Sequence, residues 1–76
     1  MAKQSSHTEL LKKFGSHLRE LRESRRLSVR ELAAHCDVDF SKINKLENYT
    51  GNITLTTLFE LAEGLEVHPK ELLNFD

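Results

Sequence analysis

Two short helical segments separated by only three residues constrain this chain more than any other feature of its sequence. The pattern predicts one helix over residues 29–36 and a second over residues 40–48. In the second segment, Ile43 and Leu46 are the only strongly apolar pair at helical spacing. Because so narrow an apolar seam covers little of a helix, most of this segment must face outward, with hydrogen-bonding and cationic side chains on its surface. Two short helices joined by a tight turn are typical of a helix-turn-helix unit.

Capping signals mark where these helices begin. Ser28 is followed by Glu31 three residues later, which predicts a capping box at the start of the second helix. Ser6 and Glu9 have the same spacing and favour a capping box at the start of the first helix. The first helix is therefore expected to begin near residue 6 and to end around residues 24–26.

The residues between the paired helices suit a tight turn. Asp37 tolerates a left-handed backbone, and the apolar Val38 is expected to be buried in the turn. Asp39 is a good N-cap for the third helix, and Thr54 for a fourth. Gly64 suits the C-terminal cap of that fourth helix.

Apolar stripes at helical spacing complete a pattern of five helices. The first helix has the stripe Leu11, Phe14, Leu18 and Leu21. The fourth has Leu55, Leu58, Leu61, Ala62 and Leu65. Pro69, which is favoured at the first position of a helix, precedes a short fifth segment with Leu72, Leu73 and Phe75. The fold class predicted is all-α, a compact domain of five helices.

The chain is long enough for one domain. We expect residues 1–9 to form an N-terminal extension and the start of the first helix, and residues 10–76 to form a single helix-turn-helix domain. No apolar run approaches the roughly 20 residues that cross a bilayer, and the first residues do not resemble a secretion signal. The single cysteine, Cys36, cannot form a disulfide within the chain. These features favour a cytoplasmic protein.

The charge is polarised along the chain although its sum is only -1. Residues 1–45 carry ten of the eleven Lys and Arg and six of the twelve Asp and Glu, a balance of +4. The remaining residues carry a balance of -5. A chain polarised in this way can present a basic face and an acidic back, although two solvated faces without a partner would give the same pattern.

The stretch RLSVRELAAHCDVDFSKINKLEN resembles the helix-turn-helix of lambda- and 434-repressor-like proteins, the Cro/C1-type (XRE) transcriptional regulators. The residues that match the family pattern are Leu27, Ser28, Leu32, Ala33, Val38, Ile43 and Glu47. The resemblance covers about residues 10–75, and the NITL segment also resembles restriction–modification controller proteins. It departs from the family at Val29, Asp37 and Asp39, where relatives usually have Gln, Gly and Ser or Thr. The resemblance implies a lambda-repressor-like domain of bacterial or phage origin that binds DNA.

The resemblance also implies roles for individual residues. The front of the third helix would contact base edges through Phe40, Ser41, Asn44 and Lys45. Short polar side chains and helix N-termini commonly hold the DNA backbone, which predicts phosphate contacts from Ser28, Arg30, Lys42, Asn48, Thr50 and Asn52. Arg22 and Glu47 match a family ion pair that joins the first helix to the recognition helix, and we interpret them as structural.

A single recognition helix reads only about four base pairs, so we expect a homodimer that binds a palindromic operator in double-stranded DNA. The residues expected at the dimer interface are Phe59, Leu65, Val67, Leu73 and Phe75. An antitoxin-like module that binds a protein partner as well as its operator is the alternative hypothesis, and a helical domain without a nucleic-acid role is a third. The four histidines lack the clustered spacing of a zinc site, and no catalytic motif is present, so we expect no metal, no cofactor and no enzyme activity.

Overall fold

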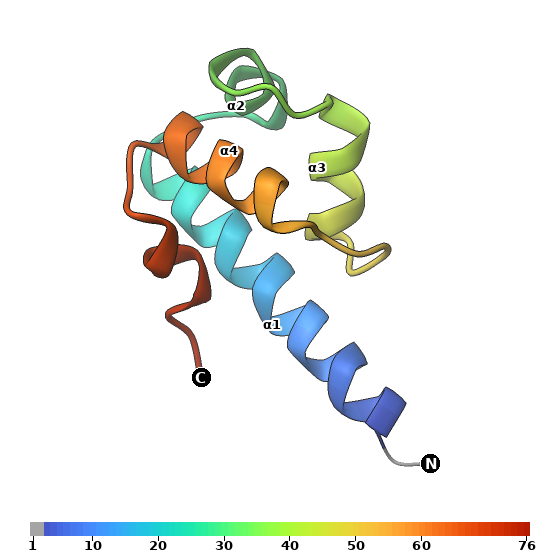
Figure 1. Ribbon diagram of the computed structural model, residues 1–76. Helices are drawn as coiled ribbons and strands as arrows, with labels where there is room; N and C mark the ends of the chain where they lie inside the picture. The colour runs from blue at the N-terminus through green and yellow to red at the C-terminus, as the bar shows by residue number, and fades with distance from the viewer. Residues whose placement is uncertain (1–2) are drawn as a thin grey trace.

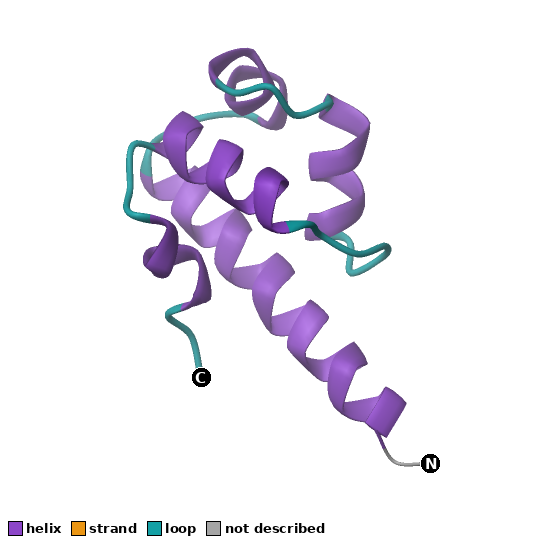
Figure 2. Cartoon of the chain, in the orientation of Figure 1, coloured by secondary structure: helices purple, strands orange, loops and turns teal. Residues whose placement is uncertain are grey.

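The computed structural model describes the backbone of residues 3–76 and the side chains from His7 onward. Four α-helices and one 3-10 helix follow one another (Figure 1): α1 Lys3–Ser24, α2 Val29–His35, α3 Phe40–Glu47, α4 Leu55–Leu65 and η1 Pro69–Leu73. Loops join them, and the described residues contain no strand (Figure 2). The all-helical prediction is confirmed, but the fifth segment is a 3-10 helix rather than an α-helix. Its five residues contain a single fully buried side chain, Leu72, and a 3-10 turn is common in so short a connector.

One hydrophobic core holds the helices together. Its largest fully buried side chains come from all five elements: Leu18, Leu32, Ile43, Leu61, Leu65 and Leu72. α1 packs against α3 and η1, while α2 packs against α3 and α4. Every helix therefore contributes to the same core, and the position of α3 depends on both α1 and α2.

The first helix begins earlier than its sequence signals indicate. α1 spans Lys3–Ser24, so Ser6 lies inside the helix and cannot be its N-cap. The predicted capping box at Ser6 and Glu9 is therefore wrong. The N-terminal turns of α1 project beyond the other helices (Figure 1), and the molecule measures 39 Å along its longest axis and 22 and 20 Å along the others.

The other predicted caps have mixed outcomes. The capping box at Ser28 and Glu31 is confirmed by both of its hydrogen bonds, and the Thr54 hydroxyl accepts a hydrogen bond from the Thr57 amide as expected. Asp39 occupies the N-cap position of α3, but its side chain makes no capping hydrogen bond. Val38 is buried in the turn, as predicted.

The left-handed residues lie where the sequence did not place them. Among the described non-glycine residues, Arg26, Tyr49 and Glu66 have positive φ angles of 57°, 69° and 60°, whereas Asp37 does not. The residue after α4 that adopts this conformation is Glu66, not a glycine. Gly64 is instead buried inside α4, where an added Cβ would lie 2.9 Å from the Cβ of Cys36. Gly64 therefore allows α2 and α4 to approach closely and does not cap the helix.

Candidate nucleic-acid interface

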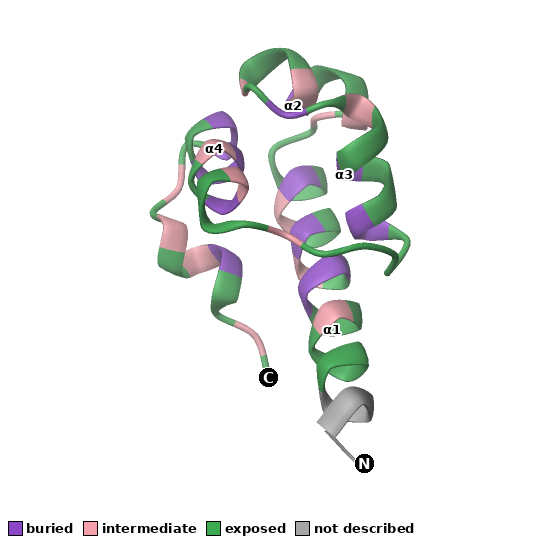
Figure 3. Ribbon diagram, turned by 45° about the vertical axis from the view of Figure 1, so that its right-hand side comes forward, coloured by how far each residue is buried: buried purple, intermediate pink, exposed green. Residues whose placement is uncertain are grey.

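α3 is attached to the molecule by one narrow side and exposes the other. Its buried residues are Ile43, Leu46 and Glu47, and in Figure 3 buried and exposed segments alternate along the helix. The outward residues Ser41, Lys42, Asn44 and Lys45 are all exposed, and Phe40 is half-buried at the N-terminal end. The structure therefore leaves the polar front of α3 uncovered by any described part of the chain.

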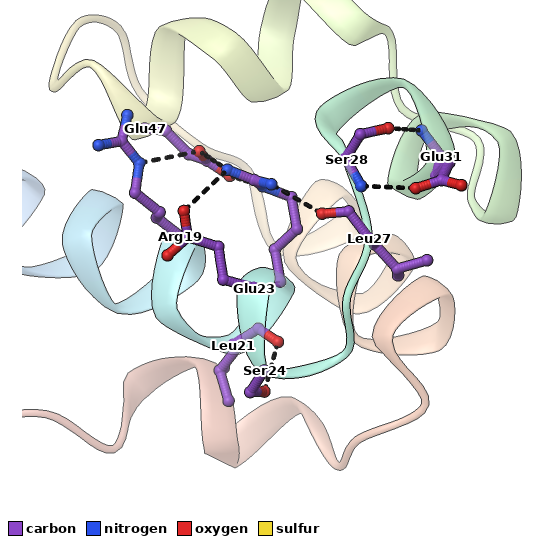
Figure 4. Close-up of polar contacts among 9 residues, drawn as sticks. Arg19, Leu21, Glu23, Ser24, Leu27, Ser28, Glu31 and Glu47 are labelled. Atoms are coloured by element: carbon purple, nitrogen blue, oxygen red, sulfur yellow. Dashed lines mark hydrogen bonds and ion pairs between the residues drawn. The ribbon is translucent and has the colours of Figure 1, made fainter.

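A buried ion pair fixes the back of this helix to α1. The Glu47 carboxylate accepts hydrogen bonds from Arg22 Nε at 2.7 Å and from Arg22 Nη2 at 2.9 Å (Figure 4). Arg19 Nε lies 3.4 Å from the same carboxylate. The hydrogen bonds to Glu47 raise the pKa of Arg22 above its ordinary value, with burial opposing the effect and the nearby acidic charges adding to it. Two parallel hydrogen bonds between one guanidinium and one carboxylate fix the geometry of the pair, so they set the orientation of α3 relative to α1.

The same arginine also fixes the approach to α2. Arg22 Nη1 donates to the carbonyl oxygen of Leu27 at 2.7 Å, in the segment between α1 and α2. Directly after it, the Ser28 hydroxyl accepts from the Glu31 amide at 3.0 Å, and the Ser28 amide donates to the Glu31 carboxylate at 2.8 Å (Figure 4). These last contacts lower the pKa of the Glu31 carboxyl below its usual 4.5, the bond from the Ser28 amide being the largest cause. One guanidinium thus connects α1, the start of α2 and the end of α3.

A residue in the first turn of α2 touches the first residue of α3 through a cation–π contact. The guanidinium carbon of Arg30 lies 4.3 Å from the centroid of the Phe40 ring. Arg30 is exposed and Phe40 is half-buried, so the pair lies at the molecular surface beside the N-terminal end of α3. Nothing in the sequence pattern indicated this contact, because residues ten apart are brought together only by the turn.

The loop after α3 extends the polar surface. The Thr50 hydroxyl and amide both donate to the carbonyl oxygen of Lys45, at 3.2 and 2.9 Å, which turns the chain away from the helix end. Gly51 has a φ angle of 89°, a conformation that favours glycine. The loop and the front of α3 enclose a hollow of about 440 Å³, lined by Asp39, Ser41, Lys42, Lys45, Leu46, Thr50, Gly51 and Asn52. Several residues predicted for base and phosphate contact therefore share one concave surface.

The α1–α3 contact depends on a glycine that sequence reasoning missed. A Cβ on Gly15 would lie 2.3 Å from the carbonyl oxygen of Leu46 and 3.0 Å from the Tyr49 ring. The left-handed Tyr49 lies over this site, and its hydroxyl is 3.0 Å from the Ser16 hydroxyl. A glycine within an otherwise strong helical stripe was the available signal for such a close approach.

The expected dimer residues separate into two groups. Leu65 is fully buried in the core, so its assignment to an intermolecular surface is wrong. Val67 and Phe75 are half-buried and pack against the chain's own core. Phe59 and Leu73 are exposed, at 50% and 56%, and Leu55, which the sequence reasoning omitted, is 68% exposed. Leu55 and Phe59 lie four residues apart on α4 and therefore share a face.

The described residues contain no group of three or more His, Cys, Asp or Glu that could hold a metal ion. The Cys36 thiol donates to the carbonyl oxygen of Leu32 at 3.2 Å, and burial raises its pKa. None of the described helices is both long enough and apolar enough to cross a membrane.

Comparison with known proteins places this geometry in a family. The family described as helix-turn-helix matches residues 18–72. The chain belongs to the helix-turn-helix family. Its resemblance to the Cro/C1-type regulators is thereby confirmed.

Individual members of the family are similar over most of the chain. The control protein C.BamHI of Bacillus amyloliquefaciens is 35% identical over 63 residues, which cover 82% of this chain and 78% of that protein. The HTH-type transcriptional repressor RghR of Bacillus subtilis (strain 168) is 36% identical over 58 residues, which cover 75% of this chain but only 43% of the repressor. This chain therefore corresponds to less than half the length of RghR.

Solved structures have the same arrangement of helices. The restriction–modification controller protein C.AhdI from Aeromonas hydrophila superimposes with a TM-score of 0.79 at 39% identity, covering 82% of this chain and 94% of that one. The hypothetical transcription factor NHTF from Neisseria gives a TM-score of 0.78 at 28% identity, covering 84% and 74%.

Proposed function

We propose that this chain binds double-stranded DNA sequence-specifically and acts as a transcriptional regulator. The supporting observation is how α3 packs on the molecule. Its buried side is held by Glu47, Ile43 and Leu46, while its polar front is exposed. One α-helix with such a front fits the major groove of B-DNA, which is about 12 Å wide. Similarity to two control proteins and a transcriptional repressor supports the regulatory role.

The front of α3 would read the bases. The residues in this role are Phe40, Ser41, Asn44 and Lys45. Lys45 can reach the O6 and N7 acceptors of guanine, Ser41 can pair with several base edges, and the Phe40 ring can contact a thymine methyl group. The phosphates would be held by Ser28, Lys42, Asn48, Thr50 and Asn52, which are all exposed.

The active form would be a homodimer on a palindrome. Two recognition helices related by a two-fold axis read half-sites about one helical turn apart. The exposed apolar residues Leu55 and Phe59 on α4, with Leu73 on η1, are suited to this contact. They replace Leu65, Val67 and Phe75 of the expected interface, because those three pack into the chain's own core.

Selection from a pool of random DNA duplexes, followed by sequencing, tests this proposal. We expect a palindromic sequence whose half-sites are centred about 10 base pairs apart. Affinity for that sequence should fall steeply as salt concentration rises, because each phosphate contact releases counterions. Lys45→Ala should relax the preference at one position of each half-site, whereas Lys13→Ala on exposed α1 is the matched control. Recovery of no sequence above the starting pool would contradict the proposal.

A further inference from the structure

The side chain of Arg30 lies on an aromatic ring at the start of the recognition helix. Arg30 is the second residue of α2 and Phe40 is the first residue of α3, and the guanidinium carbon is 4.3 Å from the ring centroid. The sequence predicts a phosphate contact for Arg30, which requires only a nearby positive charge. The observed contact defines more than the position of a charge, because it places the guanidinium over the face of a ring at the start of α3.

Within the part of the chain that the structure describes, the ring is the only partner of this guanidinium. No hydrogen bond or ion pair joins Arg30 to another described residue. The neighbouring carboxylate of Glu31 is bonded to the Ser28 amide instead. A cation in the first turn of a helix also lies at the positive end of the helix dipole, where it is unfavourable. The donors of Arg30 are therefore available to a partner outside the chain.

The ring occupies one side of the guanidinium, and its edge of N–H donors makes no hydrogen bond to any described residue. The contact also restrains the side chain before any partner arrives, so less conformational entropy is lost on binding. The free edge is a planar fork, and that fork matches the paired O6 and N7 acceptors of guanine in the major groove. Phe40 carries this fork at the N-terminal end of α3, the end at which recognition helices contact base edges.

We propose that Arg30 determines sequence specificity by reading a guanine in each half-site, and that Phe40 holds it in the orientation required. This assignment rests on the proposed function, because it presupposes that α3 enters the major groove. It makes α2 a direct contributor to base readout and changes the role of Arg30 from a phosphate contact to a base contact.

The test uses the operator recovered by selection and its single-base variants, measured with the full chain. The unsubstituted protein should prefer guanine at one position of each half-site by on the order of 10- to 100-fold. Arg30→Ala should abolish that preference while leaving the preferences at the other positions intact. Arg30→Lys should also lose most of it, because lysine keeps the charge but lacks the planar fork.

Lys42→Ala provides the matched control, since Lys42 is an exposed cation on the same surface with a proposed phosphate role. It should weaken all operator variants equally and reduce the slope of log affinity against log salt by about one. Phe40→Leu should reduce the same guanine preference as Arg30→Ala, and the double variant should lose little more than either single variant. Circular dichroism melting of each variant checks that the fold is retained.

Uniform weakening of Arg30→Ala across all base variants, with a reduced salt slope, would overturn the assignment and return Arg30 to the phosphate contacts. Independent effects of the Arg30 and Phe40 substitutions at that base would also overturn the stacking role. Absence of any sequence preference in the unsubstituted protein would reject the proposed function itself, and the role of Arg30 with it.

Discussion

At the scale of single residues, the side chain of Glu47 joins the end of α3 to Arg22 of α1. The Glu47 side chain is 2% exposed, and its carboxylate accepts hydrogen bonds from Nε and Nη2 of Arg22. Removing one partner of a buried ion pair leaves the other charge without compensation, which costs more than the pair itself contributes.

Glu47→Ala should therefore lower the free energy of unfolding by about 3 kcal/mol and weaken DNA binding in parallel, because α3 loses its attachment to α1. Urea denaturation and operator titration measure the two effects. Glu23→Ala is the matched control: Glu23 lies 4.0 Å from the same arginine but is largely exposed, so we expect a change below about 1 kcal/mol. An intact fold with abolished binding in Glu47→Ala would reject the structural role of Glu47.

Gly15 sets the distance between α1 and α3. Alanine is intrinsically better than glycine in a helix by about 1 kcal/mol, so an uncrowded site would be stabilised. Here the added Cβ would lie 2.3 Å from the Leu46 carbonyl oxygen, and backbone cannot yield as a flexible side chain can. Gly15→Ala should instead lower stability by about 2 kcal/mol. Thermal melting measures this loss of stability. Ser16→Ala is the control, because it removes only an exposed hydroxyl contact. A raised melting temperature in Gly15→Ala would contradict the close packing.

At the scale of secondary-structure elements, α2 is a helix of seven residues whose start is held by its capping box. Helices this short are marginal by themselves, so the cap and the packing of Leu32 must stabilise it. Ser28→Ala should cost about 1 kcal/mol in chemical denaturation.

The capping box should also make α2 sensitive to acid. The hydrogen bond from the Ser28 amide lowers the pKa of Glu31 in the folded chain. The contribution of Glu31 to stability is therefore complete at pH values above the pKa of the unfolded chain, and it is lost as the pH falls through the pKa of the folded chain. Stability should therefore decline below about pH 4.5, and Glu31→Gln should reduce the decline. Denaturation at a series of pH values measures this. Thr54→Ala, at a cap without a charged partner, should leave the pH dependence unchanged; an identical pH profile for Glu31→Gln would refute the assignment.

The existence of the helices could be predicted from periodicity, but several of their ends could not. The stripe from Leu11 to Leu21 and the stripe of α4 each bury one face, so they survive in any compact arrangement. Ser6 carries a local signal for a helix start, yet the helix continues through it. Gly64 has the chemistry of a cap, but its use depends on Cys36, the residue that follows α2, and no local pattern contains that contact.

The candidate site was predictable to a similar extent. The narrow seam of Ile43 and Leu46 indicated which side of α3 faces outward, and the family resemblance supplied the pairing of Arg22 with Glu47. The stacking of Arg30 on Phe40 was not predictable, because it depends on the angle between α2 and α3. That angle is set by tertiary packing.

At the scale of the whole molecule, the apolar residues left on the surface bear on assembly. Leu55, Phe59 and Leu73 are each at least half exposed, whereas the other leucines from α4 to η1 are buried. If a second copy covers them, dimer formation and palindrome binding should depend on the same side chains.

Phe59→Glu should shift the chain toward a monomer and weaken binding to the full palindrome, with little effect on the stability of the monomer, because the side chain is half exposed. Sedimentation equilibrium and operator titration measure the two effects. Leu10→Glu is the matched control, since Leu10 is a comparably exposed leucine on the projecting part of α1. A Phe59→Glu protein with unchanged mass in solution would place the intermolecular contact elsewhere.

The contacts that hold the inner side of α3 have a consequence for how such a protein can diversify. Arg22, Glu47 and the Leu27 carbonyl lie on the inner side of the helix, so the outward positions take no part in holding it. Successive mutations at Ser41, Asn44 and Lys45 could then alter the preferred target after a gene duplication without passing through an unfolded intermediate. A library randomised at those three positions should accordingly yield mostly folded proteins with new binding preferences.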